Sequence, residues 1–280
     1  MPHSSDARGT GPGIREIAVA RRGPGTAGDR ERVAVEEPME VRVNGAPFAV
    51  IMRTPGADRD LAAGFLLAED VIRGAGEIGA ITYCDDAEDE GRGNTINVTV
   101  TGGAVERLDA RLGERRQVMM TSSCGLCGRR TIESLRARVS SVDGQWTVEA
   151  AVISALPDRL RSAQAVFDST GGLHAAGLFD LSGALQLSAE DVGRHNAVDK
   201  IVGRTLLAGR HPLDRHLLLV SGRTSFELVQ KTLLAGIPLI GAVSAPSSLA
   251  IALAEEARMT LCGFVRGTSF NIYAHPERVQ

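Results

Sequence analysis

The clearest chemistry in the sequence lies in a pair of cysteines three residues apart, Cys124 and Cys127. They belong to the stretch Ser122–Gly128, whose glycines let the backbone turn and whose serines can donate to a sulfur anion. Two arginines follow directly, and a guanidinium charge favours thiolate over thiol. Helical spacing over residues 131–139 places the cysteines near a helix N-terminus, which also lowers a thiol pKa. The stretch therefore predicts a mobile loop that carries a reactive thiol pair.

Three kinds of site use two thiols at this spacing. A zinc site needs about four ligands, and no second cysteine pair is present to supply them. A thioredoxin-like dithiol has the same spacing but normally starts a long helix after a strand. In a sulfur relay, a thiolate takes the outer sulfur of a persulfide and passes it on. Four isolated residues could complete a zinc site only if folding happened to bring them to the pair: Cys84, Cys262, His174 and His195.

Length and composition narrow the class of protein. The chain has 280 residues, a formal net charge of −3 and 43% hydrophobic residues, as expected of a soluble globular protein and not of a general nucleic-acid binder. No apolar run is long enough to cross a membrane, and no secretory signal is visible. Four cysteines are too few for a disulfide framework, which favours a reducing, cytoplasmic location.

The last third of the chain supplies a second candidate site. Apolar strands are predicted at 217–220, 237–243 and 261–265, with helices between them, which is typical of a parallel sheet buried on both faces. Each of the first two strands runs into small and hydroxyl residues before its helix, at Ser221–Ser225 and Ser244–Ser248. Two such joints on neighbouring strands would present helix N-termini to one anion, although ordinary capping explains either joint alone. The candidate phosphate ligands are Ser221, Arg223, Ser225 and Ser247.

Two further stretches carry ionisable or aromatic groups. In Glu190–Lys200, Asp191, His195, Asp199 and Lys200 could form one face of a site, and His174 is a similar candidate. The plainer explanation is a solvated capping region with internal ion pairs, and a lone histidine is more often structural. A strand end with an aromatic ring and an arginine suits a stacked base or pterin and its phosphate. That segment comprises Gly263, Phe264, Val265, Arg266, Gly267, Thr268 and Ser269.

The elements that must position these residues divide the chain into three regions. Residues 1–32, rich in glycine, proline and arginine, are predicted to be a disordered tail. Region 33–140 starts with a hairpin through Asn44-Gly45, continues with a helix over 58–72 and ends in the cysteine loop and its helix. Region 141–280 holds the α/β part and may pack with region 33–140 as one domain. Within it we expect a short strand at 145–148, a helix opening at Pro157-Asp158 and a hairpin across 175–188.

Several of these motifs together resemble the formate dehydrogenase accessory sulfurtransferases, the FdhD family. The similarity spans residues 36–275. The motifs that carry it are Glu36-Glu37-Pro38, Val43-Asn44-Gly45, Met52–Gly56, Ser122–Gly128, Thr170–Ala176, Glu190–Lys200, Ser221–Lys231, Ala242–Leu249 and Gly263–Gly267.

The resemblance implies a sulfur carrier between a cysteine desulfurase and the molybdenum cofactor of formate dehydrogenase, a bis(molybdopterin guanine dinucleotide). By motif position, Cys124 matches the persulfide-bearing cysteine, Cys127 its partner and 263–269 the cofactor segment. The implied fold is a homodimeric, three-layer α/β domain like that of cytidine deaminases, with a mixed or parallel sheet and a smaller N-terminal β-containing part. Deaminase activity is not implied, because Ala175-Ala176 stands where such a site needs a glutamate.

We therefore expect a sulfurtransferase that binds the cofactor as cargo and holds no permanent metal. Its expected partners are the desulfurase, formate dehydrogenase and a second copy of the chain, with no nucleic acid and no membrane. Two alternatives remain open: a non-catalytic chaperone that binds the cofactor for formate dehydrogenase, and a dithiol redox protein.

Overall fold

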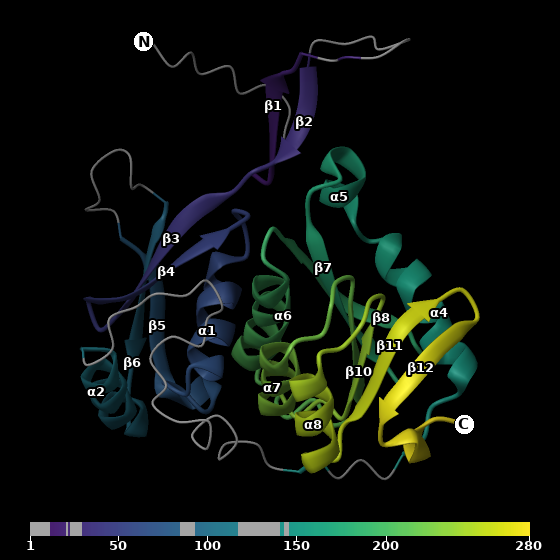
Figure 1. The fold of residues 1–280 in the computed structure, drawn as a ribbon. Helices are drawn as coiled ribbons and strands as arrows, with labels where there is room; N and C mark the ends of the chain where they lie inside the picture. Colours follow the sequence, from purple (N-terminus) through teal and green to yellow (C-terminus); the bar gives the residue numbers. More distant parts are fainter. Residues whose placement is uncertain (1–11, 21, 23–29, 85–92, 117–140, 143–145) are drawn as a thin grey trace.

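A computed structural model describes residues 12–20, 22, 30–84, 93–116, 141–142 and 146–280. Within these residues, two sheets stand on either side of a central layer of helices, and a separate two-stranded ribbon projects from one end (Figure 1). The mixed α/β class predicted from the sequence, with a smaller N-terminal β-containing part, is confirmed.

The smaller sheet has the strand order β4-β3-β6-β5. Its hairpin joins β3 (Glu37–Val43) to β4 (Ala46–Arg53), and the turn residues Asn44 and Gly45 both have positive φ, as the sequence predicted for this dipeptide. Strand β6 (Thr95–Val100) pairs parallel with β3. Strand β5 (Ile78–Tyr83) pairs antiparallel with the other edge of β6. Helices α1 (Asp58–Ala68) and α2 (Gly103–Arg116) and the 3-10 turn η1 (Ala75–Glu77) complete this part.

The larger sheet has the order β12-β11-β10-β9-β7-β8. Its centre is parallel, as predicted, and consists of β9 (His216–Val220), β10 (Leu239–Ala242) and β11 (Thr260–Arg266). The predicted hairpin of β7 (His174–Asp180) and β8 (Leu185–Asp191) is confirmed, and it extends the sheet antiparallel to β9. At the other edge lies β12 (Ser269–Ala274), which the sequence analysis did not identify.

Helices cover both faces of this sheet. Along the strands, alternate residues belong to two separate clusters, so that Leu218 packs with α6 (Arg194–Leu207), α7 (Phe226–Leu234) and α8 (Ser248–Glu256), whereas Leu217 and Leu219 pack with α4 (Ala150–Arg161). The 3-10 turn η3 (Pro276–Arg278) follows β12. The cluster under α6 also includes the core of the smaller sheet, so one hydrophobic core spans the boundary at residue 140.

Helices α1 and α6 join the two parts at unusually short range. A Cβ atom at Gly64 would lie 2.0 Å from the carbonyl oxygen of Asp199, and one at Gly203 would lie 1.8 Å from that of Asp60. Both distances are far below contact, so the two backbones touch only because both positions are glycine. This helix pair sets how the smaller sheet lies against the larger one.

The prediction of a disordered tail over residues 1–32 is wrong for its described part. Strand β1 (Ile14–Ala18) pairs antiparallel with β2 (Arg30–Ala34). The ribbon is mostly exposed, so it lacks the apolar alternation of a half-buried strand, and its ordering comes from backbone pairing. Short helix α5 (Ala165–Thr170) lies against it, with Val166 beside Gly13.

Other predicted boundaries need correction. Helix α4 begins at Ala150 and contains Pro157, because the apolar spacing that buries Ile153, Leu156 and Leu160 starts before the proline. The first helix ends at Ala68, four residues earlier than predicted. The short strand predicted at 145–148 is reduced to an isolated bridge between Val148 and Val279. Its first residue, Gln145, lies outside the described residues. The predicted helix over 131–139 also lies outside them.

Candidate functional site

The sulfur site predicted from the sequence, Cys124 and Cys127, lies outside the described residues. The remaining cysteines differ in exposure: Cys84 is half-buried, and Cys262 is fully buried in β11. Burial raises the pKa of the Cys262 thiol to about 12, which keeps it protonated and unreactive at neutral pH. Cys262 is thus a core residue.

The two strand–helix joints meet at one edge of the larger sheet, as expected from neighbouring parallel strands. The backbone N–H of Thr224 donates to the carbonyl oxygen of Ala245 at 3.2 Å, and that of Ser247 donates to the carbonyl of Thr224 at 2.9 Å. The joints are thus held together by their own backbones. The hydroxyl of Thr224 is buried and has no hydrogen-bond partner among the described residues.

The serines that begin the two helices have different roles. Ser247 is an ordinary cap: its Oγ accepts from the backbone N–H of Ala250 at 3.3 Å, at the start of α8. Ser225 holds the same position on α7, but its Oγ lies 3.1 Å from Nε2 of His195 and makes no capping bond. Capping therefore explains Ser247 at the start of α8. The Ser225 hydroxyl at the start of α7 instead belongs to a polar cluster.

Replacing Ser247 with alanine is expected to lower the free energy of unfolding by about 1 kcal/mol, the usual cost of losing an N-cap. Ser248→Ala is the control, because Ser248 is exposed and one residue further on. Urea denaturation of both variants measures the difference. Equal stabilities would show that the Ser247 hydroxyl does not cap α8.

His195 lies at the centre of the polar cluster. Its Nε2 lies 3.0 Å from a carboxylate oxygen of Glu227 as well as 3.1 Å from Ser225. Burial, together with the charges of Lys231 and Arg194, lowers the pKa of His195 to about 3, so the imidazole is neutral. Burial raises the pKa of Glu227. A neutral histidine and a high-pKa carboxyl that face each other can share one proton.

The lowered pKa of His195 predicts that stability falls in acid. Unfolded histidine has a pKa of about 6.5, so below that pH the unfolded chain binds a proton that the folded chain excludes. We expect a loss of up to about 1.4 kcal/mol per pH unit from this residue as pH falls below about 6.5. The raised pKa of Glu227 gives a pH dependence of stability with the opposite sign. Comparing the wild type with His195→Gln isolates the contribution of the histidine. Unfolding free energies at pH 7.5 and 5.5 should differ less in this variant than in the wild type. An identical pH dependence would contradict the assignment.

The acidic residues flanking His195 belong to structural ion pairs. Asp191 is fully buried at the end of β8, where it pairs with Lys200 at 2.7 Å and accepts from the backbone N–H of Thr54 at 3.1 Å. Asp199 pairs with Lys231, also at 2.7 Å. The shared site face expected from their spacing therefore does not form. Asp191 accepts from the backbone N–H of Thr54 and Lys200 donates to its carbonyl oxygen, and these two bonds tie the larger part to the smaller one.

The predicted cofactor segment 263–269 covers the end of β11, a turn and the start of β12. Phe264 is 40% exposed with φ +53°, a conformation that is strained for a bulky residue. The Cζ of Arg266 lies 5.9 Å from the centre of this ring, and its Nε donates to the carbonyl of Val243 at 3.0 Å. Thr268, Ser269 and Gly267 are exposed, Gly263 is buried, and the Val265 side chain is part of the core. Arg223, from the β9–α7 joint, is also exposed.

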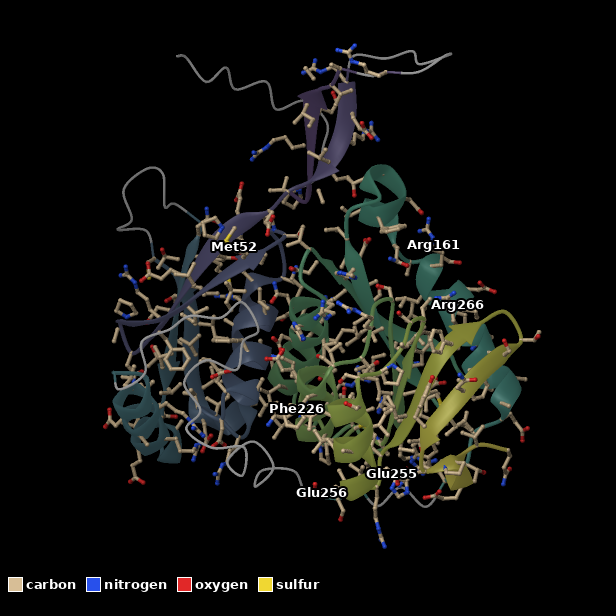
Figure 2. The ribbon with its side chains drawn as sticks, viewed as in Figure 1. Met52, Arg161, Phe226, Glu255, Glu256 and Arg266 are labelled. Carbon is tan, nitrogen blue, oxygen red and sulfur yellow. The ribbon has the colours of Figure 1, made fainter. Side chains whose placement is uncertain are left out.

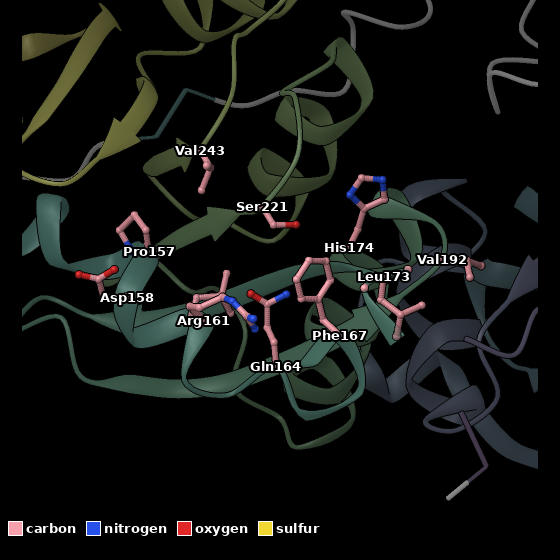
Figure 3. A pocket seen from close by; sticks show the side chains of 13 residues that line it. Pro157, Asp158, Arg161, Gln164, Phe167, Leu173, His174, Val192, Ser221 and Val243 are labelled. Carbon is pink, nitrogen blue, oxygen red and sulfur yellow. The ribbon is translucent and has the colours of Figure 1, made fainter. Parts of the chain in front are cut away.

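A pocket of about 670 Å³ opens at the same sheet edge (Figure 3). Of the residues proposed from sequence, Ser221 and His174 line it, and Val243 connects it to Arg266. Arg161 lines its other side, and Figure 2 shows Arg161 and Arg266 at the same end of the larger part. The sequence analysis missed Gln164, another polar residue that lines the pocket, because a lone glutamine between two helices has no recognisable pattern.

A polar ligand fits the chemistry of this edge. The Nε of Arg194 is buried and, within the described part of the chain, has no hydrogen-bond partner; its side chain lies beside Gly222 and the pocket residue His174. Buried polar atoms usually have partners, so such atoms next to a pocket suggest groups that a ligand satisfies. No group of three or more histidine, cysteine or acidic side chains in the described ranges is arranged to hold a metal. No described helix is both long and apolar enough to span a bilayer.

The protein has a mixed α/β fold with a pocket where its parallel strands end. It therefore belongs to the class of α/β proteins that bind ligands at the carboxyl edge of a sheet. The chain belongs to the FdhD/NarQ family, whose model matches residues 34–280.

Proteins called sulfur carrier protein FdhD are similar to almost the whole chain. That of Streptomyces avermitilis is 50% identical over 274 residues, which cover 95% of this chain and 93% of the relative. That of Mycolicibacterium paratuberculosis is 50% identical over 253 residues, with 89% and 92% covered. A crystal structure assigned to a formate dehydrogenase accessory protein of Desulfotalea psychrophila has a TM-score of 0.72 at 28% identity and covers 95% of this chain and 98% of that one.

Proposed function

We propose that this chain is a sulfur carrier for formate dehydrogenase maturation. It takes persulfide sulfur from a cysteine desulfurase onto Cys124 and delivers it to the molybdenum of a bis(molybdopterin guanine dinucleotide) cofactor. The observation that carries the proposal is the 50% identity to sulfur carrier proteins over nearly the whole chain, together with a thiol pair in a small-residue, arginine-flanked setting.

The first step is thiol exchange. The Cys124 thiolate attacks the outer sulfur of the donor's persulfide, the donor's sulfur–sulfur bond breaks, and the donor cysteine leaves as a thiolate. Cys124 then carries the sulfur as a persulfide. The two arginines after the loop favour the attacking thiolate by their charge.

The second step releases the sulfur. The Cys127 thiolate attacks Sγ of Cys124, and the outer sulfur leaves with its bonding electrons as sulfide, the form needed for a sulfido ligand on molybdenum. A Cys124–Cys127 disulfide remains, which a cellular dithiol reduces. In this scheme the electrons that release the sulfide come from Cys127, and the cellular dithiol restores them for the next turnover.

The sheet edge described above is the proposed binding region for the cargo. The pocket, the buried Arg194 Nε and the exposed Phe264 and Arg266 supply polar, aromatic and cationic contacts within one face. Such contacts suit a ligand with heteroaromatic rings and diphosphates. We propose that the carrier acts in the cytoplasm as a homodimer that meets the desulfurase and formate dehydrogenase in turn.

Reconstitution tests the proposal. Formate dehydrogenase that contains sulfur-free cofactor should gain formate oxidation when the chain, a cysteine desulfurase and L-cysteine are added together. Omitting the chain is the control, and it should leave the enzyme inactive. Equal activation with and without the chain would rule out the carrier role.

A further inference from the structure

A second pocket lies where the ribbon and the two parts of the molecule meet. Its volume is about 280 Å³, and its walls come from β1, from the loop between β4 and α1, and from β8 and α6, which are labelled in Figure 1. The loop contributes Pro55 and Gly56 of the Met52–Gly56 motif, which has no part in the proposed sulfur transfer. Small ligands often bind between structural parts, in pockets of about 300–1,000 Å³. This junction pocket is at the lower limit of that range and suits a ligand of about the size of one amino acid.

Two charged residues that line the junction pocket are engaged within the chain. The ammonium group of Lys200 has three donors, which bond to Asp191 at 2.7 Å and to two backbone carbonyl oxygens at 2.9 and 3.2 Å. The Glu190 carboxylate accepts from two backbone N–H groups at the start of α5, at 2.8 and 3.0 Å. Recognition of a ligand therefore depends on the other polar groups of the pocket.

Asp60 and Arg204 are charged residues of the pocket that keep bonding capacity. Nε of Arg204 lies 3.9 Å from Oδ2 of Asp60, which is too far for a hydrogen bond, and no described residue donates one to this carboxylate. Burial raises the pKa of Asp60 although the charges of Arg204 and Lys200 oppose the rise, so its carboxylate is short of partners. The Arg204 side chain is 61% exposed. An ion pair this long and exposed adds little stability, so a ligand can separate it at small cost.

Ser188 adds backbone hydrogen-bonding groups from the free side of β8. Among the described strands, β8 is the last of the larger sheet. The N–H and C=O of Ala175 both bond to Ser221 on the β9 side, so those of its β8 partner Glu190 point away from β7. Ser188 lies two residues earlier in unbroken register, so its N–H and C=O point to the same side. They are therefore available to a ligand in the junction pocket, which Ser188 lines.

The rest of the junction pocket is apolar. Its apolar side chains come from the ribbon, from α5, from β8 and from α6, and they include Ile14, Val166, Leu173, Leu187 and Ile201. A ligand that uses the whole pocket needs one cationic group, one anionic group close to it, and an apolar body. A phosphate or a simple cation meets only one of these needs.

We propose that the junction pocket binds a free α-amino acid with an apolar side chain. The ammonium and carboxylate groups of such a ligand are joined through one carbon atom, so they can pair with Asp60 and Arg204, whose charged groups lie side by side. The backbone of Ser188 hydrogen-bonds to the same two groups, and the ligand's side chain packs on the apolar wall. The inference does not rest on the proposed function. A bound amino acid would contact the ribbon and both parts of the molecule, and would hold them together.

Calorimetry with three probes tests this inference on the wild-type protein. L-leucine carries both charges and an apolar side chain, isoamylamine lacks the carboxylate, and isocaproic acid lacks the ammonium group. We expect L-leucine to bind at least about tenfold more tightly than either fragment, because each fragment loses a hydrogen-bonded charged contact. Addition of L-leucine should also shift the backbone amide resonance of Ser188. The proposal is overturned if L-leucine does not bind, if it binds no more tightly than the fragments, or if the Ser188 resonance does not move.

Two variants separate the contacts. Asp60→Asn keeps the shape of the side chain, and it should weaken L-leucine binding at least about tenfold and leave isocaproic acid unaffected. Arg204→Gln should weaken L-leucine and isocaproic acid and leave isoamylamine unaffected. Asp109→Asn is the matched control, because Asp109 is an exposed carboxylate on α2, and it should bind all three probes like the wild type. Circular dichroism checks that each variant is folded. A folded Asp60→Asn protein that binds L-leucine like the wild type would contradict the assignment.

Discussion

Replacing Gly203 with alanine should lower the free energy of unfolding by about 3 kcal/mol or more. The added Cβ would lie 1.8 Å from the carbonyl oxygen of Asp60 and 2.6 Å from the backbone nitrogen of Gly64. Neither atom is a side chain that can rotate away, so the helices α1 and α6 must separate. Separation would open the core that both sheets share and strain the hydrogen bonds from Asp191 and Lys200 to the backbone of Thr54.

Urea or thermal denaturation measures this effect, and Gly64→Ala should behave alike, because its Cβ would meet the backbone of Asp199. Gly76→Ala is the matched control: nothing lies within 4 Å of a Cβ there, and its φ is not positive. A Gly203→Ala protein as stable as Gly76→Ala would mean that the two helices do not pack as closely as described.

The second large effect concerns activity. Cys124→Ala should reduce the activation of formate dehydrogenase to the background seen without the chain, because it removes the thiol that is proposed to accept the donor's sulfur. Reconstitution with desulfurase, cysteine and the sulfur-free enzyme measures it. The variant should keep wild-type stability, since the sequence places Cys124 among small residues with no apolar packing pattern.

Two other cysteines provide the comparison. Cys84→Ala removes a half-buried thiol outside the motif and should activate the enzyme like the wild type. Cys127→Ala should accept sulfur on Cys124 but fail to release it. Normal activation by both motif variants would instead favour a chaperone that binds the cofactor without carrying sulfur.

The parts of the fold that follow local rules were predictable. Asn44-Gly45 defines a hairpin turn by its positive φ, and the apolar strands around β9 and β10 define a buried parallel sheet. From parallel pairing it also follows that the joints after β9 and β10 share an edge, which is why Ser221 could be proposed near the site. The β1–β2 ribbon was missed because it buries almost no apolar surface.

Features that depend on contacts between distant segments were not predictable. Nothing local to Gly64 or Gly203 shows that each faces the other's helix, and each looks like an ordinary helix-weakening residue. Glu227 and His195 meet only when α6 and α7 pack together. Gln164 reaches the pocket because the chain breaks between α4, which ends at Arg161, and α5, which begins at Ala165.

The central claim, that Cys124 carries sulfur, is tested most directly by the intact mass of the protein after incubation with a cysteine desulfurase and L-cysteine. We predict a gain of about 32 Da, one sulfur atom, that reductant removes and that Cys124→Ala lacks. An unchanged wild-type mass, or the same gain in Cys124→Ala, would contradict it.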